Sequence, residues 1–363
     1  MTYYLLASSF LFFFTSFAYI VDRKSQVKLA FIIVTIFVIF CGLRWYSGKD
    51  YGAYTDIFMM MPTLSDFYFT DMSDIPGEIG YKFLNSLFKT MLFESYSTLF
   101  FIAAFSLYLK LFFYTKLPGN VFFCICFYLA LHFYHAEFIQ VRMSLGLAIL
   151  CLAVLCYLKK DNLKFLISVF FASTIHSVCA VFVVLLLTRY FKLKSLLTLA
   201  FTLPILFSFV SVLRPLLDLS MGLFYNSILV AVYNYAYGVH GENVFIYNFT
   251  PLRHMVIVLA LIVFYPKINE LDDIKITLIK IYLIGIILSS FFMDIELLYS
   301  RAIYLFDIVE PIVLCMLIFL VRNLYLRAFA FFLASFFPLL LMSRAGLELL
   351  GLFEYSTWLH LIF

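Results

Sequence analysis

Charged side chains are scarce in this sequence of 363 residues. Aspartate, glutamate, lysine and arginine together make up 13% of it, and the net charge is only +4. A charge this small, held in short loops, excludes the broad basic surface of a nucleic-acid-binding protein. The Gly-x-x-x-x-Gly-Lys, His-Glu-x-x-His and Gly-x-Ser-x-Gly motifs are also missing. Soluble nucleotide-binding, protease and hydrolase functions therefore have no support, and any energy source must come with the substrate.

No two cysteines have the Cys-x-x-Cys spacing. The seven cysteines are odd in number and lie almost wholly inside apolar runs, so they indicate core residues and neither a disulfide framework nor a zinc site. A removable signal peptide is not indicated either. The first apolar run, residues 2–21, has no basic residue before it and no small-residue cleavage site after it. It predicts a retained membrane span.

Hydrophobic residues are abundant instead, at 65% of the chain, with 21% aromatic residues and a mean hydropathy of +1.05. They form repeated apolar runs of about 15 to 22 residues, the length that crosses a bilayer. The runs lack the alternating pattern of barrel strands, and lipid cannot satisfy backbone polar groups, so the spans must be helices. We predict an all-α integral membrane protein with about 10–12 transmembrane helices in a single transmembrane domain, residues 1–363.

Basic residues set the predicted topology because lysine and arginine collect on the cytoplasmic side. The basic turn at residues 22–28 places the N-terminus outside, and Lys110 and Lys116 mark the cytoplasmic end of the third span. The predicted external loops are residues 43–94, 135–142, 214–252 and 293–301. The run at 165–188 is interrupted midway, and a single span there would place later basic turns outside. We therefore predict two short helices that meet near His176, a break tolerated where it is buried in protein or lines a polar cavity.

A cluster of polar residues, 44–54, follows directly on the second predicted span. It is either an anchoring belt or the rim of a polar site. Arginines also end three other spans on the predicted outer face, so the full set is Arg44, Arg142, Arg253 and Arg301. A single arginine of this kind could simply extend to lipid headgroups. Four of them, on the side where anchoring arginines are not expected, indicate a diphosphate site, since a guanidinium matches phosphate oxygens in paired hydrogen bonds.

Carboxylates stand at helical spacing from tyrosines in the first external loop. Asp50 precedes Tyr54 by four residues, and Glu78 precedes Tyr81 by three, so each pair shares a face if the segment is helical. Such pairs suit sugar hydroxyls. Two other interpretations stay open: a solvated loop with ordinary turns, or a divalent cation held by Glu78 with two nearby aspartates, Asp71 and Asp74.

Three ionisable residues lie inside apolar runs. His176 coincides with the predicted helix break and has a pKa suited to accepting a proton, although a lone histidine of this kind is often just hydrogen-bonded to a carbonyl. Asp307 and Glu310 follow Tyr304 at three-residue steps. Both carboxylates must face the bundle interior, where they pair with a basic group or are protonated. Structural pairing and catalysis both remain open for them.

Several of these short motifs occur together in a familiar order. They are Arg44, Gly48, Asp50, Tyr51 and Tyr54; Glu78-Ile79-Gly80-Tyr81; Arg142 before a small-residue helix; His176; and Arg301 with Tyr304. In these features the chain resembles the EpsG-type branch of the Wzy polysaccharide polymerases, bacterial membrane enzymes of exopolysaccharide and O-antigen assembly.

The resemblance implies a lipid-dependent glycosyltransferase-like bundle in the bacterial inner membrane, with its active site facing the periplasm or outside. Such enzymes join undecaprenyl-diphosphate-linked repeat units into O-antigen, capsule or exopolysaccharide and release undecaprenyl diphosphate. The partners implied are the lipid-linked donor and acceptor, membrane lipid and a chain-length regulator protein. Electrostatic and positioning catalysis of this kind needs no bound cofactor.

The site residues follow from combining the motifs with this resemblance. External arginines would hold the diphosphate, a carboxylate or His176 would take the acceptor proton, and tyrosines would stack on sugar rings. The catalytic candidates are Arg44, Asp50, Arg142, His176 and Arg301. The substrate-binding candidates are Tyr51, Tyr54, Glu78, Tyr81, Arg253, Tyr304 and Asp307.

Two other functions compete with the polymerase. An O-antigen ligase uses the same donor with a lipid A core acceptor, and sequence separates the two poorly. A flippase or transporter would place its charges near the bilayer midplane between repeated halves. Most charges here lie at the predicted outer rim and no repeated halves are visible, which favours the enzyme.

Overall fold

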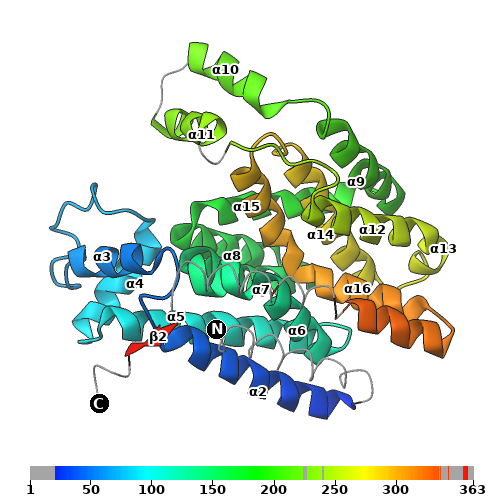
Figure 1. Cartoon of the computed structure of the whole chain (residues 1–363), viewed down its shortest axis with the longest axis horizontal. Coiled ribbons are helices and arrows are strands. Elements are labelled where there is room, and N and C mark those ends of the chain that lie inside the picture. Colours follow the sequence, from blue (N-terminus) through cyan, green and yellow to red (C-terminus); the bar gives the residue numbers. More distant parts are fainter. Residues whose placement is uncertain are drawn as a thin grey trace. The chain divides into compact units, whose positions relative to one another are not determined.

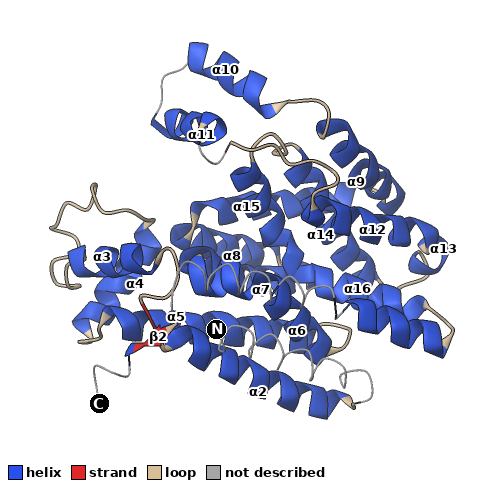
Figure 2. Ribbon diagram, in the orientation of Figure 1, coloured by secondary structure: helices blue, strands red, loops and turns tan. Residues whose placement is uncertain are grey.

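Helices make up nearly all of the protein in the computed structural model (Figure 1, Figure 2). The structure describes residues 21–223, 227–238, 241–334, 336, 342 and 355–358. The predicted first span, 2–21, lies almost wholly outside these residues. The chain divides into two compact units: unit 1 comprises residues 1–180 and 321–363, and unit 2 comprises residues 181–320. That the two form a single transmembrane domain stays a prediction.

Unit 1 holds the N-terminal helices. Its elements are α2 (Arg23–Gly42), β1 (Arg44–Trp45), α3 (Tyr51–Met60), α4 (Ile79–Thr90), α5 (Ser95–Lys116), α6 (Val121–His132), the π-helix η1 (Phe133–Ile139), α7 (Val141–Leu158), α8 (Asn162–Ile175) and β2 (Ser356–Thr357). The 3-10 helix η2 (Ser177–Tyr190) begins in this unit and ends in unit 2. Unit 1 also contains the helix Leu324–Ala334.

Unit 2 holds a second set of helices. They are α9 (Leu193–Phe207), α10 (Leu213–Leu223), α11 (Ser227–Tyr237), α12 (Phe249–Val263), α13 (Tyr265–Ile268), α14 (Asp273–Ser290), α15 (Glu296–Phe306), the short 3-10 turn η3 (Asp307–Val309) and α16 (Glu310–Leu320). In this unit α14 packs against α9, α15 and α16, and α9 also packs against α12.

Five helical stretches of the described chain are long and apolar enough to cross a membrane: Arg23–Gly42, Ser95–Lys116, Val121–Ile139, Val141–Leu158 and Glu296–Leu320. Five shorter apolar helices, of 10–17 residues, accompany them. The prediction of an all-α integral membrane protein is confirmed. The predicted number of 10–12 spans is not reached by full-length helices among the described residues.

Helix α5 is central to unit 1, where it packs between α2 and α7, while α8 packs on the other side of α7 (Figure 1). Sequence determines where these helices begin: the Asp22 carboxylate caps α2 by accepting the Lys24 and Ser25 amides, and Asp161 caps α8 by accepting the Lys164 amide. Such caps satisfy amides that have no partner within the helix.

The break predicted near His176 is confirmed. α8 ends at Ile175, His176 has an extended backbone (φ −149°, ψ 115°), and the next helix starts at Ser177. The new helix has the tighter 3-10 geometry, which is uncommon over 14 residues. The His176 amide still donates to the Ala172 carbonyl (3.0 Å), whereas the Ser177 amide donates to a side chain, the Glu78 carboxylate (2.9 Å).

All four predicted external loops contain helix. The segment 43–94 contains α3 and α4. Residues 133–139 form η1, so the segment 135–142 is a continuation of α6 and the start of α7. The segment 214–252 contains most of α10 and all of α11, and residues 296–301 already belong to α15. A loop outside the membrane can contain short amphipathic helices, so these helices do not contradict the predicted loops. The membrane side on which these segments lie stays a prediction.

The interpretation of Lys110 as part of a cytoplasmic end was wrong. Its side chain is fully buried within the bundle and forms an ion pair with Glu137 of η1. A lysine can be buried in this way only with an acidic partner, and that partner lies 27 residues away in the sequence.

The C-terminal residues of unit 1 return to the segment after α2. β2 pairs antiparallel with β1, so that Arg44 lies opposite Thr357. Trp358 adds two hydrogen bonds, from its amide to the Leu43 carbonyl (3.0 Å) and from its indole to the Gly42 carbonyl (2.8 Å). This pairing fixes the backbone that carries Arg44.

Candidate functional site

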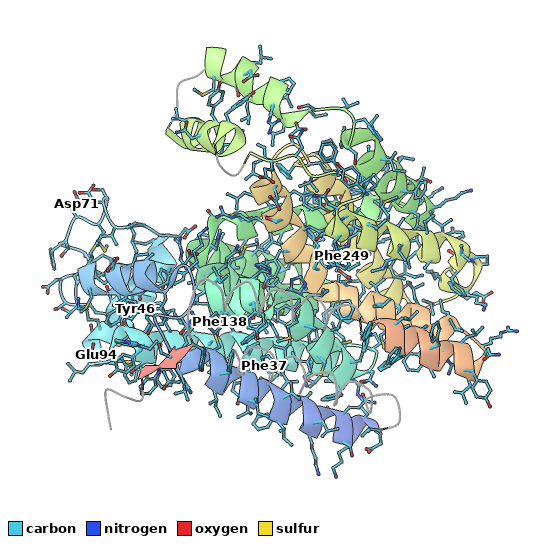
Figure 3. All side chains as sticks on the ribbon, in the orientation of Figure 1. Phe37, Tyr46, Asp71, Glu94, Phe138 and Phe249 are labelled. Atoms are coloured by element: carbon cyan, nitrogen blue, oxygen red, sulfur yellow. The ribbon has the colours of Figure 1, made fainter. Side chains whose placement is uncertain are left out.

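Arg44 is buried in unit 1, and two aromatic rings lie beside its guanidinium. The guanidinium carbon lies 4.5 Å from the centre of the Phe138 ring and 5.7 Å from the Tyr51 ring; Phe138 is labelled in Figure 3. One terminal nitrogen, Nη1, donates to the Glu137 carbonyl (3.4 Å), and Nε has no hydrogen-bond partner among the described residues. Arg44 therefore has a fixed position and makes no ion pair within the described chain.

Arg142 stands in the first turn of α7 and pairs with Glu78. Its Nη1 donates to Glu78 Oε2 at 3.2 Å, and its guanidinium lies 5.7 Å from the centre of the Tyr81 ring. Gly77 precedes the carboxylate with φ +117°, and a Cβ there would stand 3.1 Å from Arg142 Nη1. A glycine is required at 77 both for the left-handed backbone and for this close approach.

The Glu78 carboxylate also accepts hydrogen bonds at the break between α8 and η2. Its Oε1 accepts hydrogen bonds from the Ser177 amide (2.9 Å) and hydroxyl (3.0 Å), and lies 3.9 Å from His176 Nδ1. Because Glu78 immediately precedes α4, one side chain connects α4, α7 and the junction of α8 with η2.

Three tyrosines form the buried wall of this region. Tyr51, Tyr54 and Tyr81 belong to one apolar cluster, and the Tyr54 and Tyr81 rings meet edge to face at 6.2 Å. Burial raises the pKa of Tyr51 to about 12 and raises the pKa of Tyr81, against the opposing positive charges of Arg142 and Arg44. Both arginines thus act on the same tyrosine cluster, and the tyrosines remain neutral hydrogen-bond donors at physiological pH.

Asp50 and His176 are the two proton acceptors proposed from sequence. Asp50 caps the start of α3 without a side-chain capping bond, and it lies near enough to Tyr54 to oppose the ionisation of that phenol. His176 Nδ1 accepts a hydrogen bond from the Val178 amide at 3.4 Å. The carboxylate of Asp50 makes no ion pair within the described chain, whereas the Nδ1 lone pair of His176 is engaged.

Glu78 should make the stability of this region sensitive to acid. Partial burial opposes its ionisation, but the Ser177 amide, His176 and Arg142 outweigh burial and lower its pKa below the ordinary 4.5. The stability that the ionised Glu78 adds to the folded state is therefore fully present above pH 4.5. It is lost as the pH falls through the lower pKa that Glu78 has in the folded protein. We expect wild-type protein in detergent to melt above Glu78→Gln at pH 7, with the difference shrinking below about pH 4. A difference that stays constant from pH 7 to pH 3 contradicts the pairing.

Unit 2 contains a separate buried charge cluster. Arg253 of α12 donates from Nη2 to Asp307 Oδ2 and to Glu310 Oε2, each at 3.0 Å, and its Nε lies 2.8 Å from Glu310 Oε1. His254 joins the cluster directly, with its Nε2 3.5 Å from Asp307 Oδ1 and 3.4 Å from Arg253 Nη2, and the Tyr282 hydroxyl is 2.8 Å from its Nδ1. The prediction that Asp307 and Glu310 face the interior and pair with a base is confirmed.

His254, Asp307 and Glu310 are also the group in the described chain whose ligand atoms are close enough for a metal ion, all within 4.8 Å of one another. Imidazole and carboxylates suit several divalent metals. However, the Arg253 guanidinium already occupies both carboxylates, and a divalent cation would have to displace that charge. The alternative group of Asp71, Asp74 and Glu78 is not brought together as a metal site among the described residues.

Among the described residues, Arg301 makes no salt bridge, in contrast to Arg253. It lies in α15, three residues before Tyr304, and its Nε is buried without a hydrogen-bond partner among the described residues. Tyr304 is buried. Within unit 2, therefore, Arg253 is engaged by carboxylates, whereas Arg301 forms no such pair in the described part of the chain.

Eight of the predicted residues belong to unit 1, and the other four belong to unit 2. The eight are Arg44, Asp50, Tyr51, Tyr54, Glu78, Tyr81, Arg142 and His176. Convergence of all four arginines joins residues of both units and stays a prediction. Sequence reasoning missed the roles of Phe138, Glu137 and His254. The only available signals were a glutamate and a histidine inside or beside apolar runs.

The family model described as the EpsG family matches residues 27–357, nearly the whole chain. No curated protein and no solved structure matches the chain.

Proposed function

The chain belongs to the EpsG family, a family of polysaccharide polymerase-like membrane proteins, and from that premise we propose that it joins lipid-linked oligosaccharide repeat units into a polysaccharide. The donor proposed is a glycan on polyprenyl diphosphate, undecaprenyl diphosphate in bacteria. The site proposed faces the outer side of the inner membrane. The observation that carries the proposal is the placement of two arginines, Arg44 and Arg142, around one buried tyrosine cluster.

The reaction needs a cationic site for its leaving group. An acceptor sugar hydroxyl attacks the anomeric carbon of the donor glycan, the bond from that carbon to the diphosphate breaks, and the diphosphate leaves with the electron pair. Guanidinium groups stabilise the charge that develops on the diphosphate oxygens. Arg44 fits this role because its N–H groups are held by rings and carbonyls rather than by a carboxylate.

The acceptor hydroxyl must also lose its proton. Asp50 is the carboxylate best placed to accept it, since it makes no ion pair and lies beside Tyr54. Glu78 is less suited because its oxygens are occupied by Arg142 and Ser177. We assign Glu78 to holding Arg142 in place, and His176 to shaping the break that presents the Ser177 amide. The neutral tyrosines supply rings and hydroxyls for the sugars.

Arg301 of unit 2 is a further candidate for binding a phosphate. Two lipid diphosphates take part in the reaction, those of the donor and of the acceptor, and the Arg301 Nε makes no hydrogen bond within the described residues. Arg253 and Asp307 are assigned a structural role, because the buried ion pairs of Arg253 with Asp307 and Glu310 connect α12 to η3 and α16.

Purified protein in nanodiscs with an undecaprenyl-diphosphate-linked repeat unit should convert it into a ladder of longer glycans and release undecaprenyl diphosphate. No cofactor is added. Transfer only to a lipid A core acceptor identifies a ligase instead, and movement of intact precursor across a vesicle membrane identifies a transporter. If neither ladder nor lipid diphosphate forms with cognate substrate, the polymerase proposal is wrong.

A further inference from the structure

A second group of charged residues lies inside the helix bundle of unit 1, outside the site described above. Lys110 of α5 and Glu137 of η1 form an ion pair with side chains 0% and 1% exposed. Around it are Ser106 and Ser144, each 2.7 Å from the Lys110 ammonium through the hydroxyl oxygen, and Tyr128, whose hydroxyl donates to Glu137 Oε1 at 2.8 Å. Five side chains from α5, α6, η1 and α7 thus form one buried network.

A contribution to stability does not by itself explain this network. Removing two charges from water costs several kcal/mol per ion, and replacing a buried pair by neutral residues is often harmless or stabilising. Ionisable groups within membrane spans are accordingly functional candidates by default. The position of the Lys110–Glu137 pair indicates what that function is.

Glu137 connects the network to Arg44 through its own backbone. Its side chain is fixed by Lys110, while its carbonyl accepts hydrogen bonds from Arg44 Nη1 (3.4 Å) and from Cys41 Sγ (3.0 Å). The next residue, Phe138, supplies the ring 4.5 Å from the Arg44 guanidinium. Gly48 has φ +108°, and a Cβ at this position would stand only 3.3 Å from that ring.

The backbone that presents these groups is a π-helix of seven residues. Such wide turns are rare, occur mostly as single-turn bulges, and are often found at functional sites. An ion pair at the centre of η1 supplies the constraint that selects this geometry over a regular continuation of α6. Lys110 also lies 3.0 Å from the Ser144 carbonyl, two residues after Arg142, so the same ammonium contacts the first turn of α7.

We propose that the Lys110–Glu137 pair is a positioning device that fixes the π-helix and thereby sets the guanidinium of Arg44 in its phosphate-binding orientation. The pair touches neither substrate nor reacting atoms. The proposal rests on the proposed function of Arg44, and it assigns a role to residues that the reaction itself does not use.

A double-mutant cycle tests this role. The neutral variant Lys110→Met/Glu137→Gln removes both charges together, and glutamine keeps an acceptor for Tyr128, so no buried charge is left unpaired. We compare it in the wild-type background and in the Arg44→Ala background. The two readouts are kcat for ladder formation and the Kd for undecaprenyl diphosphate. The binding readout covers the case in which Arg44→Ala leaves too little turnover to measure.

Because a small displacement of a catalytic group can cost up to about 100-fold in rate, we expect the neutral variant to lower kcat at least about 10-fold and to weaken lipid diphosphate binding. In the Arg44→Ala background the same change should alter either value by less than about 2-fold, since it acts through Arg44. Leu150→Ala in α7 serves as the control, because it removes buried side-chain volume without removing a charge or a hydrogen-bonding group. Its effects should be the same in both backgrounds.

Equal effects of the neutral variant in the two backgrounds contradict positioning and indicate a structural role. Wild-type kcat and Kd in the neutral variant also overturn the proposal. Failure of the proposed function is a different result: wild-type protein would then bind or turn over no lipid-linked glycan at all.

Discussion

Replacing Arg142 by alanine is expected to lower kcat for glycan polymerisation about 100- to 1,000-fold, the usual cost of removing one donor that stabilises a developing oxyanion. The same change leaves Glu78 without its guanidinium partner, 3.2 Å away in the wild type. Loss of ladder products with retention of single lipid-linked units, measured with purified protein, checks this expectation.

Two companion variants separate charge from geometry at this position. Arg142→Lys keeps the positive charge but not the planar fork of donors, so we expect only partial recovery of kcat. Arg322→Ala removes an exposed arginine of the same unit and should leave turnover unchanged. Full activity of Arg142→Ala would show that this guanidinium does not act on the leaving group.

Replacing Arg253 by methionine is expected to have the largest effect on stability. The change leaves the carboxylates of Asp307 and Glu310, both almost fully buried, without their cation. Breaking a buried pair in this way typically costs about 3–5 kcal/mol. A lower midpoint of thermal unfolding in detergent, together with reduced yield of folded protein, measures the effect.

The matched control for Arg253 neutralises the whole cluster. Arg253→Met/Asp307→Asn/Glu310→Gln removes all three charges and should regain most of the lost stability. If the Arg253→Met protein melts at the wild-type temperature, the ion pairs of Arg253 with Asp307 and Glu310 do not stabilise the fold as expected.

Sequence predicted well those features that depend on local composition. Apolar runs indicated the helices, and the polar residues within 165–188 indicated the break at His176. Asp50 and Glu78 each directly precede a helix, as their spacing to Tyr54 and Tyr81 required. The charges of Asp307 and Glu310 could not stay unpaired in an apolar span, which predicted a basic partner without naming Arg253.

Features that depend on long-range contacts could not be predicted. Lys110 was interpreted as a cytoplasmic residue because the positive-inside tendency treats every lysine alike and its partner, Glu137, lies in another helix. The pairing of Arg44 with Thr357 joins two-residue strands more than 300 positions apart, too short to leave any pattern. The choice of a π-helix at 133–139 depends on the same buried pair, so it was equally hidden.

The most direct test of the central claim, that Arg44 and Arg142 form a diphosphate site, is the affinity of purified protein in nanodiscs for undecaprenyl diphosphate, measured by calorimetric titration. We predict that Arg44→Ala and Arg142→Ala each weaken Kd at least about 10-fold, as expected for a lost charge-assisted hydrogen bond, while Arg322→Ala binds as the wild type does. Wild-type affinity in both Arg44→Ala and Arg142→Ala would contradict the account.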